Sequence, residues 1–486
     1  MPAALLAAPI PWGELALLVL VDAVIAAVAW RIVIGSARDS GALARVASLS
    51  AGGFVVAWAV VDILIAAGLY GPQANAWNLG PAPGFGDAVA AGQLPYRDFQ
   101  LEYPPLSIVA FAAPALFRLG SAELSSYVIA FQALMLAFGI VVCFLVARTA
   151  LQLGATRRQL ATASAFVAAS PILLGPVLLG RYDLWPTVLT AAALAAVVAD
   201  RPAAGFAALG LGALAKVVPG LLLPLFAIHA WRRHGRDAAV RGVAVFAAVV
   251  GLGLLPFLLV APEGTLRALV RFVQRPLEVE ALGAALLVVA HNLVGLPIHP
   301  QAGFGSANLT GASASIVGLL QTIVLGLALL GIWTAFWRDH AGAPGTADRD
   351  ARRLVLAAAA TLAAYVAFSK VLSPQYLTWL VPVGALLAVG PGARRALGGL
   401  AVLLLLTCAV WPFVYTEYSR QHELGPALVV LARDLGLVVF AAYLLARLWR
   451  DRQAGDRQAG DRQAGDHGAS DRQPWTSSPG QVSESR

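Results

Sequence analysis

The chain has 486 residues, of which 59% are hydrophobic and 12% charged, and its formal net charge is +8. Soluble domains carry about a quarter charged residues, so this composition excludes a soluble globular protein and indicates an integral membrane protein. The positive charge does not indicate nucleic-acid binding, because no basic patch alternates with stacking aromatic residues. The two cysteines, Cys143 and Cys408, each lie inside an apolar run and provide neither a disulfide framework nor a metal site.

Residues 12–34 form the first apolar run, and Arg38 and Arg45 follow it. Because basic residues favour the cytoplasmic side of a membrane, we expect the N-terminus on the outside. No basic region precedes this run, so we interpret it as a transmembrane helix rather than a cleaved signal peptide. Residues 1–48 are therefore predicted to form an extra N-terminal transmembrane helix and a cytoplasmic loop.

Further apolar runs predict transmembrane helices along most of the remaining chain. They cover residues 49–70, 124–147, 160–179, 184–199, 203–230, 239–260, 316–337, 354–368, 377–389, 397–414 and 426–448. The run at 203–230 is interrupted at Lys216 and Pro219, and arginines on both sides of it favour two short helices over one tilted span. Residues 106–117 are apolar but too short to span, so we expect them at the membrane interface or in a re-entrant segment.

These runs predict an all-α polytopic membrane protein of about 11–13 transmembrane helices, whose main domain covers residues 49–450. Alternation across the membrane places two long loops, residues 71–105 and 261–313, on the extracytoplasmic side. The C-terminus is expected in the cytoplasm. Residues 451–486 begin with three Asp-Arg-Gln-Ala-Gly repeats. This charge-balanced segment is poor in apolar residues, so we expect a disordered tail.

Polar residues that the topology does not explain gather at the expected extracytoplasmic end. They are Arg181, Asp183, Lys216, Arg275, Glu278, Glu280, Lys370, Gln375, Tyr376, Glu417 and His422, together with the first long loop. A charge at membrane depth costs about 2.5–3.5 kcal/mol unless it is paired or faces water, so these residues predict a wet cavity lined by both signs. Each has an alternative interpretation. In the first alternative, Arg181 and Asp183 form only a local pair at a loop tip. In the second, the side chains of Lys216 and Lys370 extend to the membrane interface. In the third, Glu417 and His422 lie in an ordinary solvated loop.

Such a set of residues suits glycosyl transfer from a lipid phosphate. A carboxylate can accept the proton of a sugar hydroxyl, while Lys and Arg neutralise a departing phosphate. Aromatic rings offer apolar faces to sugars, and grooves between helices can hold a lipid chain. An ion-coupled transporter also uses buried charges and broken helices, so this class remains an alternative.

Five stretches resemble glycosyltransferase family 87, whose members are polytopic enzymes of the GT-C fold. The most specific is Gly-Gln-Leu-Pro-Tyr-Arg-Asp-Phe-Gln-Leu-Glu-Tyr-Pro-Pro-Leu at residues 92–106, which is similar to the signature loop of that family. The others lie at residues 180–186, 215–219, 275–280 and 373–380. The resemblance implies a GT-C-like bundle, a polyprenyl-phosphate sugar donor, an inverting displacement and a catalytic carboxylate in the first long loop.

The first long loop departs from the family pattern at Asn78. Relatives usually have an Asp about nine residues before the position of Asp87, and this chain has Asn78 there by that count. An amide cannot act as a general base. We therefore expect the catalytic carboxylate among Asp87, Asp98 and Glu102. Three alternatives stay open: Asp98 and Glu102 pair with Arg97 for structural reasons, the count that places Asn78 at the Asp position is off by some residues, or this member is catalytically impaired.

The predicted function is that of a multi-pass plasma-membrane hexosyltransferase. It would move a hexose, mannose by family precedent, from polyprenyl phosphate to an extracytoplasmic glycan or glycolipid acceptor. The residues expected to bind the donor phosphate are Arg181, Lys216, Arg275 and Lys370. Those expected to bind substrate are Tyr96, Arg97, Tyr103, Asp183, Gln375 and Tyr376. No metal site and no cofactor besides the lipid-linked donor are predicted. The alternatives are a transporter or lipid flippase, and a non-catalytic relative that binds lipid-linked sugars.

Overall fold

The computed structural model describes residues 41–71, 79–117, 124–338 and 347–470. Seven helices in these ranges are long and apolar enough to cross a membrane, and five shorter apolar helices accompany them. The protein is therefore an all-α polytopic membrane protein, as the apolar runs predict. The first expected span at 12–34 and the position of Asn78 lie outside the described residues.

The described part of the first half of the chain is mostly helical. Its helices are α2 (Gly41–Ala66), α3 (Ala82–Ala90), η3 (Pro105–Ser107), α4 (Ile108–Leu116), α5 (Leu124–Gln152), α6 (Arg157–Leu174), α7 (Pro176–Leu179), α8 (Leu184–Val198), α9 (Pro202–Ala215), η4 (Val218–Leu222), α10 (Leu223–His234) and α11 (Arg236–Val260). The run at 203–230 thus forms two helices that separate at Lys216, which confirms the two-helix prediction. Residues 105–116 form only the short η3 and α4.

The second half of the chain contains a small sheet as well as helices. The helices are α12 (Pro262–Gln274), α13 (Leu282–Val294), α14 (Ala312–Trp337), α15 (Ala347–Phe368), η6 (Pro374–Trp379), α16 (Leu380–Leu386), η7 (Leu387–Val389), α17 (Ala393–Cys408), η8 (Ala409–Val414), α18 (Tyr415–Ser419) and α19 (Leu424–Ser470). Strands β1 (Leu277–Glu278), β3 (Ser306–Thr310) and β2 (His299–Gly303) pair antiparallel in that order. The long loop at 261–313 is therefore an ordered unit of two helices and three strands.

Helix α15 occupies the interior of the bundle, whereas α11 lies at its periphery. In the most apolar window of each helix, 83% of the α15 residues are buried and none of the α11 residues are. The alanine-rich centre of α15, from Ala357 to Ala364, allows neighbouring helices to approach closely, which is how helices associate in lipid. The exposed apolar face of α11 suits contact with lipid chains.

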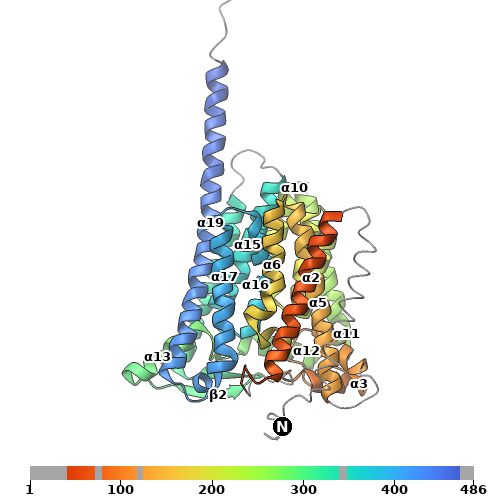
Figure 1. Cartoon of the computed structure of the whole chain (residues 1–486), viewed down its shortest axis with the longest axis vertical. Helices are drawn as coiled ribbons and strands as arrows, with labels where there is room; N and C mark the ends of the chain where they lie inside the picture. The colour runs from red at the N-terminus through yellow and green to blue at the C-terminus, as the bar shows by residue number, and fades with distance from the viewer. Residues whose placement is uncertain (1–40, 72–78, 118–123, 339–346, 471–486) are drawn as a thin grey trace, which may run out of the picture.

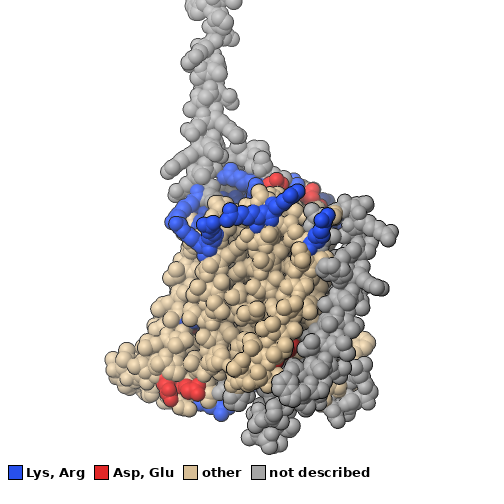
Figure 2. Space-filling view, viewed as in Figure 1, with Lys and Arg blue, Asp and Glu red and all other residues tan. Residues whose placement is uncertain are grey.

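Both long loops lie at one end of the bundle. Figure 1 shows α3 from the first loop and α12, α13 and β2 from the second at the end opposite to the one from which α19 projects. Lys and Arg gather at the α19 end in the view of Figure 2, where the last turn of α10 also carries Arg232 and Arg233. This distribution agrees with the expected placement of the loops on one side of the membrane and the basic residues on the other.

The structure corrects the prediction for the first part of the tail. Helix α19 continues to Ser470 and extends well beyond the bundle (Figure 1), so residues 451–470 are helical rather than disordered. Ala, Arg and Gln in the repeats have high helix propensity. They also extend a helix that is already nucleated, which removes the cost of starting a new one. At the other end of the domain, α2 begins at Gly41 rather than at the expected residue 49.

Candidate functional site

A cavity opens at the end of the bundle that holds the two long loops. Its volume is about 140 Å³. Its lining includes predicted residues from several elements: Tyr103, Arg181, Asp183, Lys216 and Gln375. A second chamber adjoins it and is lined by Glu102, Tyr103, Lys216, Arg275, Gln375 and Tyr376. The two chambers share Tyr103, Lys216 and Gln375, so we treat them as one site, called the loop-side cavity from here on.

Lys216 and Asp183 form a buried ion pair in the wall of this cavity. Lys216 Nζ lies 2.7 Å from Asp183 Oδ1, and the two side chains are 11% and 2% exposed. Burial lowers the pKa of Lys216 and raises that of Asp183, while the attraction between the two charges opposes both shifts. Because its ammonium is held by Asp183 in the cavity wall, Lys216 does not extend to the interface.

The chain places both partners by interrupting helices. Helix α9 ends at Ala215, because Pro219 has no N–H to donate to the Ala215 carbonyl and its ring would clash with it. Lys216 has extended backbone angles, and the next helical turn, η4, begins at Val218. Asp183 precedes α8, where an Asp side chain commonly caps the helix. Here it makes no capping hydrogen bond and instead accepts one from Lys216.

Three aromatic rings surround the Lys216 ammonium. Its nitrogen lies 4.9 Å from the ring centroid of Tyr182, 4.8 Å from that of Tyr376 and 4.9 Å from that of Trp379. Rings at this distance attract a cation through their negative faces. Tyr376 and Trp379 stack on each other at 4.4 Å, so the cage is rigid.

A second polar group centres on Glu278. Its Oε1 accepts a hydrogen bond of 2.8 Å from Ser373 Oγ, and its backbone N–H donates to the carbonyl of Lys370. Arg275 Nη2 lies 3.7 Å from Glu278 Oε2 and donates to Ser306 Oγ at 3.1 Å. Glu278 is 3% exposed, and this burial raises its pKa above the usual value for Glu.

Glu280 lies two residues further along the same wall. Its Oε1 is 3.9 Å from Arg433 Nη1 and is buried without a hydrogen-bond partner among the described residues. Arg433 is closer to Asp434, at 2.7 Å, and therefore compensates Glu280 only in part. Burial consequently raises the pKa of Glu280 to about 8.

The turn at residues 94–99 is held together by Asp98. Its carboxylate accepts a hydrogen bond from the backbone N–H of Leu94 and forms two hydrogen bonds with Arg97. These bonds lower the pKa of Asp98 to about 2. The alternative prediction of an Arg97–Asp98 pair is thus confirmed, and neither residue lines the loop-side cavity.

The remaining predicted residues divide between the cavity and its surroundings. Glu102 is exposed and lines the second chamber. Asp87 is exposed on α3 and lines neither chamber. Tyr96 is buried outside both chambers, and its hydroxyl donates to the carbonyl of Tyr103 at 2.6 Å. Lys370 also lies outside both, and its Nζ donates to the carbonyl of Val273 at 3.0 Å.

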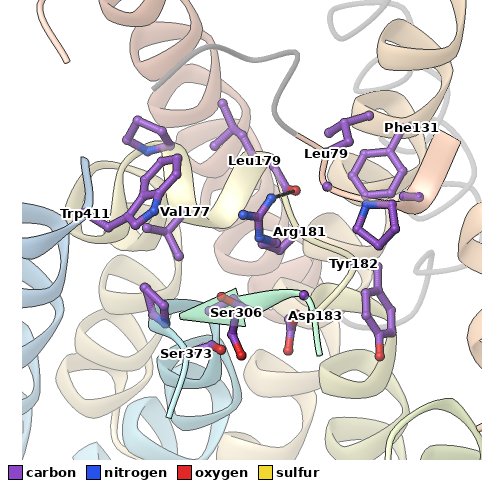
Figure 3. A pocket seen from close by; sticks show the side chains of 18 of the residues that line it. Leu79, Phe131, Val177, Leu179, Arg181, Tyr182, Asp183, Ser306, Ser373 and Trp411 are labelled. Atoms are coloured by element: carbon purple, nitrogen blue, oxygen red, sulfur yellow. Dashed lines mark hydrogen bonds between the residues drawn. The ribbon is translucent and has the colours of Figure 1, made fainter. Parts of the chain in front are cut away.

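Arg181 lies where the polar and apolar walls of the cavity meet (Figure 3). The polar side chains nearby are Asp183, Ser306 and Ser373, and the apolar ones are Leu79, Val177, Leu179 and Trp411. The Arg181 guanidinium is 5.9 Å from the ring centroid of Trp411. One end of the cavity thus suits a hydrocarbon chain and the other suits a polar group.

Glu278 and Glu280, which the sequence predicts to face the cavity without assigning them a role, line it. The sequence analysis does not predict five further lining residues: Tyr182, Ser306, Ser373, Trp411 and Tyr415. Glu278 and Glu280 belong to a stretch that resembles the family, so that signal was sufficient to find them. Ser306 and Trp411 carry no comparable signal in the sequence, because their place depends on the pairing of β3 and on the end of α17.

A family model described as glycosyltransferase family 87 matches residues 101–348, just over half of the chain. The chain belongs to glycosyltransferase family 87. The match begins inside the signature loop and contains Glu102, Arg181, Asp183, Lys216 and Glu278. This family 87 protein is therefore a membrane glycosyltransferase. A comparison with curated proteins finds no match.

Proposed function

We propose that the protein transfers a hexose, mannose by family precedent, from polyprenyl phosphate to an extracytoplasmic glycan or glycolipid acceptor with inversion. The observation that carries this proposal is the position of Arg181 between the apolar and polar walls of the loop-side cavity. A polyprenyl-phosphate sugar has a hydrocarbon chain, a phosphate and a polar sugar in that order. The apolar wall, Arg181 and the polar wall follow the same order.

The cations of the cavity suit the departing phosphate. Arg181 and Lys216 line the first chamber, and Arg275 lines the second. As the bond between the sugar C1 and the phosphate oxygen breaks, negative charge develops on that oxygen. Positive groups fixed in a site of low dielectric constant stabilise this charge without having to reorganise. Lys216 is already fixed by Asp183 and three rings.

A carboxylate of the cavity would accept the proton of the acceptor hydroxyl as its oxygen bonds to C1 from the side opposite the phosphate. Of the predicted pool of Asp87, Asp98 and Glu102, Glu102 alone lines a chamber. Glu278 is the second candidate, because it lines the cavity with its pKa raised by burial, and a base works best when its pKa approaches the working pH.

The proposed orientation places the loop-side cavity on the extracytoplasmic face of the plasma membrane, with the N-terminus outside and α19 projecting into the cytoplasm. The basic residues at the α19 end support it. With this orientation the donor enters from the outer leaflet, and the acceptor approaches from the aqueous side of the two long loops.

The test uses membranes that contain the protein and polyprenyl phosphates carrying labelled mannose or labelled glucose. The proposal expects mannose to be transferred, and the product to have the anomeric configuration opposite to that of the donor. Retention of configuration would contradict the single displacement. Tight binding of the donor without turnover of either sugar would instead identify a non-catalytic lipid-sugar-binding protein.

A further inference from the structure

A second, separate cavity lies at the end of the bundle from which α19 projects. It has a volume of about 300 Å³ and lies between the start of α15, the end of η7 and the last membrane turns of α19. Its lining residues are Leu153, Arg349, Arg352, Arg353, Val355, Leu356, Leu386, Leu387, Gly390, Pro391 and Arg447. Four of these are arginines and none is acidic, so the cavity, called the arginine cavity from here on, has a strong positive charge.

Two of the four arginines are buried. Arg353 is 3% exposed and Arg447 is 8% exposed. Arg447 lines the cavity, and its Nη1 is buried with no hydrogen-bond partner among the described residues. Its guanidinium also lies 5.8 Å from the ring centroid of Tyr443. A buried charge is stabilised by a nearby opposite charge, so an anion in the cavity would compensate Arg447.

The other two arginines, Arg349 and Arg352, are half-buried. Arg352 Nη1 is 3.4 Å from the carbonyl of Leu153, a weak hydrogen bond that leaves the rest of the guanidinium available. Asp348 and Asp350 stand beside Arg349 in the chain, but neither lines the cavity. Gly390 and Gly392 bring the backbone close to Arg447. Of the two, Gly390 lines the cavity, and a side chain there would contact the Arg447 guanidinium.

We propose that the arginine cavity binds a phosphate group. Arginine forks donate two parallel hydrogen bonds to phosphate oxygens, and several forks around one small cavity match its tetrahedral shape and charge. The leucine and valine side chains at the inner wall add an apolar flank. Two sources carry this chemistry: the headgroup of an anionic phospholipid, and a soluble phosphate compound from the aqueous side.

This site does not depend on the proposed transfer reaction. The loop-side cavity and the arginine cavity share no lining residue, and they lie at opposite ends of the bundle. Helix α19 nevertheless connects the two ends of the bundle. Its Arg447 lines the arginine cavity, and its Arg433 lies beside Glu280, which lines the loop-side cavity. An anion in the arginine cavity would therefore stabilise α19 at its basic end.

The experiment measures the thermal midpoint of the purified full-length protein in detergent. One series adds inorganic phosphate, a second adds phosphatidylglycerol, and a third adds phosphatidylcholine. If only phosphatidylglycerol raises the thermal midpoint, the bound phosphate group belongs to a lipid headgroup. If inorganic phosphate raises the thermal midpoint, the cavity binds a soluble phosphate compound. The absence of a rise with either anion overturns the proposal.

The variants Arg447→Gln and Arg352→Gln test the location. Removing one charged donor is expected to weaken anion binding about tenfold. The affinity is measured as the anion concentration that produces half of the maximal increase in thermal midpoint. The matched control is Arg450→Gln, an exposed arginine one turn further along α19, which should keep the affinity. Because Arg447 is buried, its substitution alone can disturb folding, so Arg352→Gln provides a second variant at a less buried position. The thermal midpoint of each variant without anion is measured first to show that it folds. The proposal fails if Arg450→Gln weakens binding as much as both cavity variants, or if Arg181→Gln abolishes the rise.

Discussion

Lys216 Nζ donates a 2.7 Å hydrogen bond to Asp183 Oδ1, which joins two segments 33 residues apart in the wall of the cavity. Each segment interrupts the apolar helices of the membrane domain, α9 at Lys216 and α7–α8 at Asp183. The pair therefore fixes two helix breaks relative to each other. It also sets the position of the Lys216 ammonium within its cage of rings, and this makes it the structural anchor of the site.

Breaking this pair from one side is expected to destabilise the protein strongly. Lys216→Met leaves Asp183 buried and uncompensated, which costs about 3–5 kcal/mol. The double variant Lys216→Met with Asp183→Asn should recover much of that loss, because it leaves no buried charge. Thermal unfolding in detergent of the two single variants and the double variant measures the coupling. Additive losses would mean that the pair contributes nothing through its charge.

The carboxylates should differ sharply in their effect on transfer. Glu102→Gln or Glu278→Gln is expected to lower the transfer rate by about 10²–10⁴-fold if that residue is the base, which is the usual range for general-base catalysis. Asp87→Asn is the matched control, because Asp87 is exposed on α3 and lines neither chamber. The initial rate of transfer at saturating donor concentration is compared among the three variants. Full activity in both Glu variants would remove them as candidates.

The raised pKa of Glu280 predicts a loss of stability at alkaline pH. A carboxyl whose pKa is about 8 in the folded protein and 4.5 in the unfolded chain contributes stability below about pH 4.5. That contribution falls as the pH rises through about 8, because a buried charge forms beside Glu278 and Asp434, with Arg433 and Arg181 compensating in part.

Glu280→Gln tests this titration because an amide does not ionise. Its thermal midpoint should fall less between about pH 6 and pH 9 than that of the wild type. Glu263→Gln is the control, since the Glu263 side chain is 91% exposed. The same pH dependence in the wild type and Glu280→Gln would show that another group titrates.

Gly264 gives a test of how α12 packs on the signature loop. A methyl group added at Gly264 would collide with the backbone carbonyl of Tyr96. Gly264→Ala should therefore destabilise the protein and lower transfer, despite the better helix propensity of Ala. Gly251→Ala in α11 meets no atom within 4 Å and should be neutral or stabilising. Thermal midpoints of both variants make the comparison, and equal midpoints would contradict this packing.

Features that depend on residues close together in the sequence can be predicted from it. Contacts between residues far apart in the sequence cannot. The break at Lys216 follows from Pro219 and the nearby arginines, and the Arg97–Asp98 pair involves adjacent residues. In contrast, the bond between Ser373 and Glu278 joins residues 95 positions apart and requires β1 to meet the segment after α15. No local pattern predicts such a meeting, so the sequence indicates Glu278 as a cavity residue but not its contact with Ser373.

The helical tail and the placement of Lys370 show the same limit. Low apolar content predicts disorder for the repeats, but α19 is already formed where they begin, so helix propensity decides their conformation. Lys370 is unusual in sequence because it opposes the charge bias. In the structure its side chain binds the carbonyl of Val273, and its own carbonyl holds Glu278. Its contribution to the site comes through the backbone.

The most direct test of the account is the rate of hexose transfer from labelled polyprenyl phosphate mannose by Arg181→Gln. Arg394→Gln, an exposed arginine that lines neither chamber, serves as the control. If Arg181 stabilises the departing phosphate, its loss should reduce kcat/KM for the donor by about 100-fold, whereas the control should match the wild type. A rate for Arg181→Gln within about threefold of the wild type would contradict the account, because that is less than 1 kcal/mol of transition-state stabilisation.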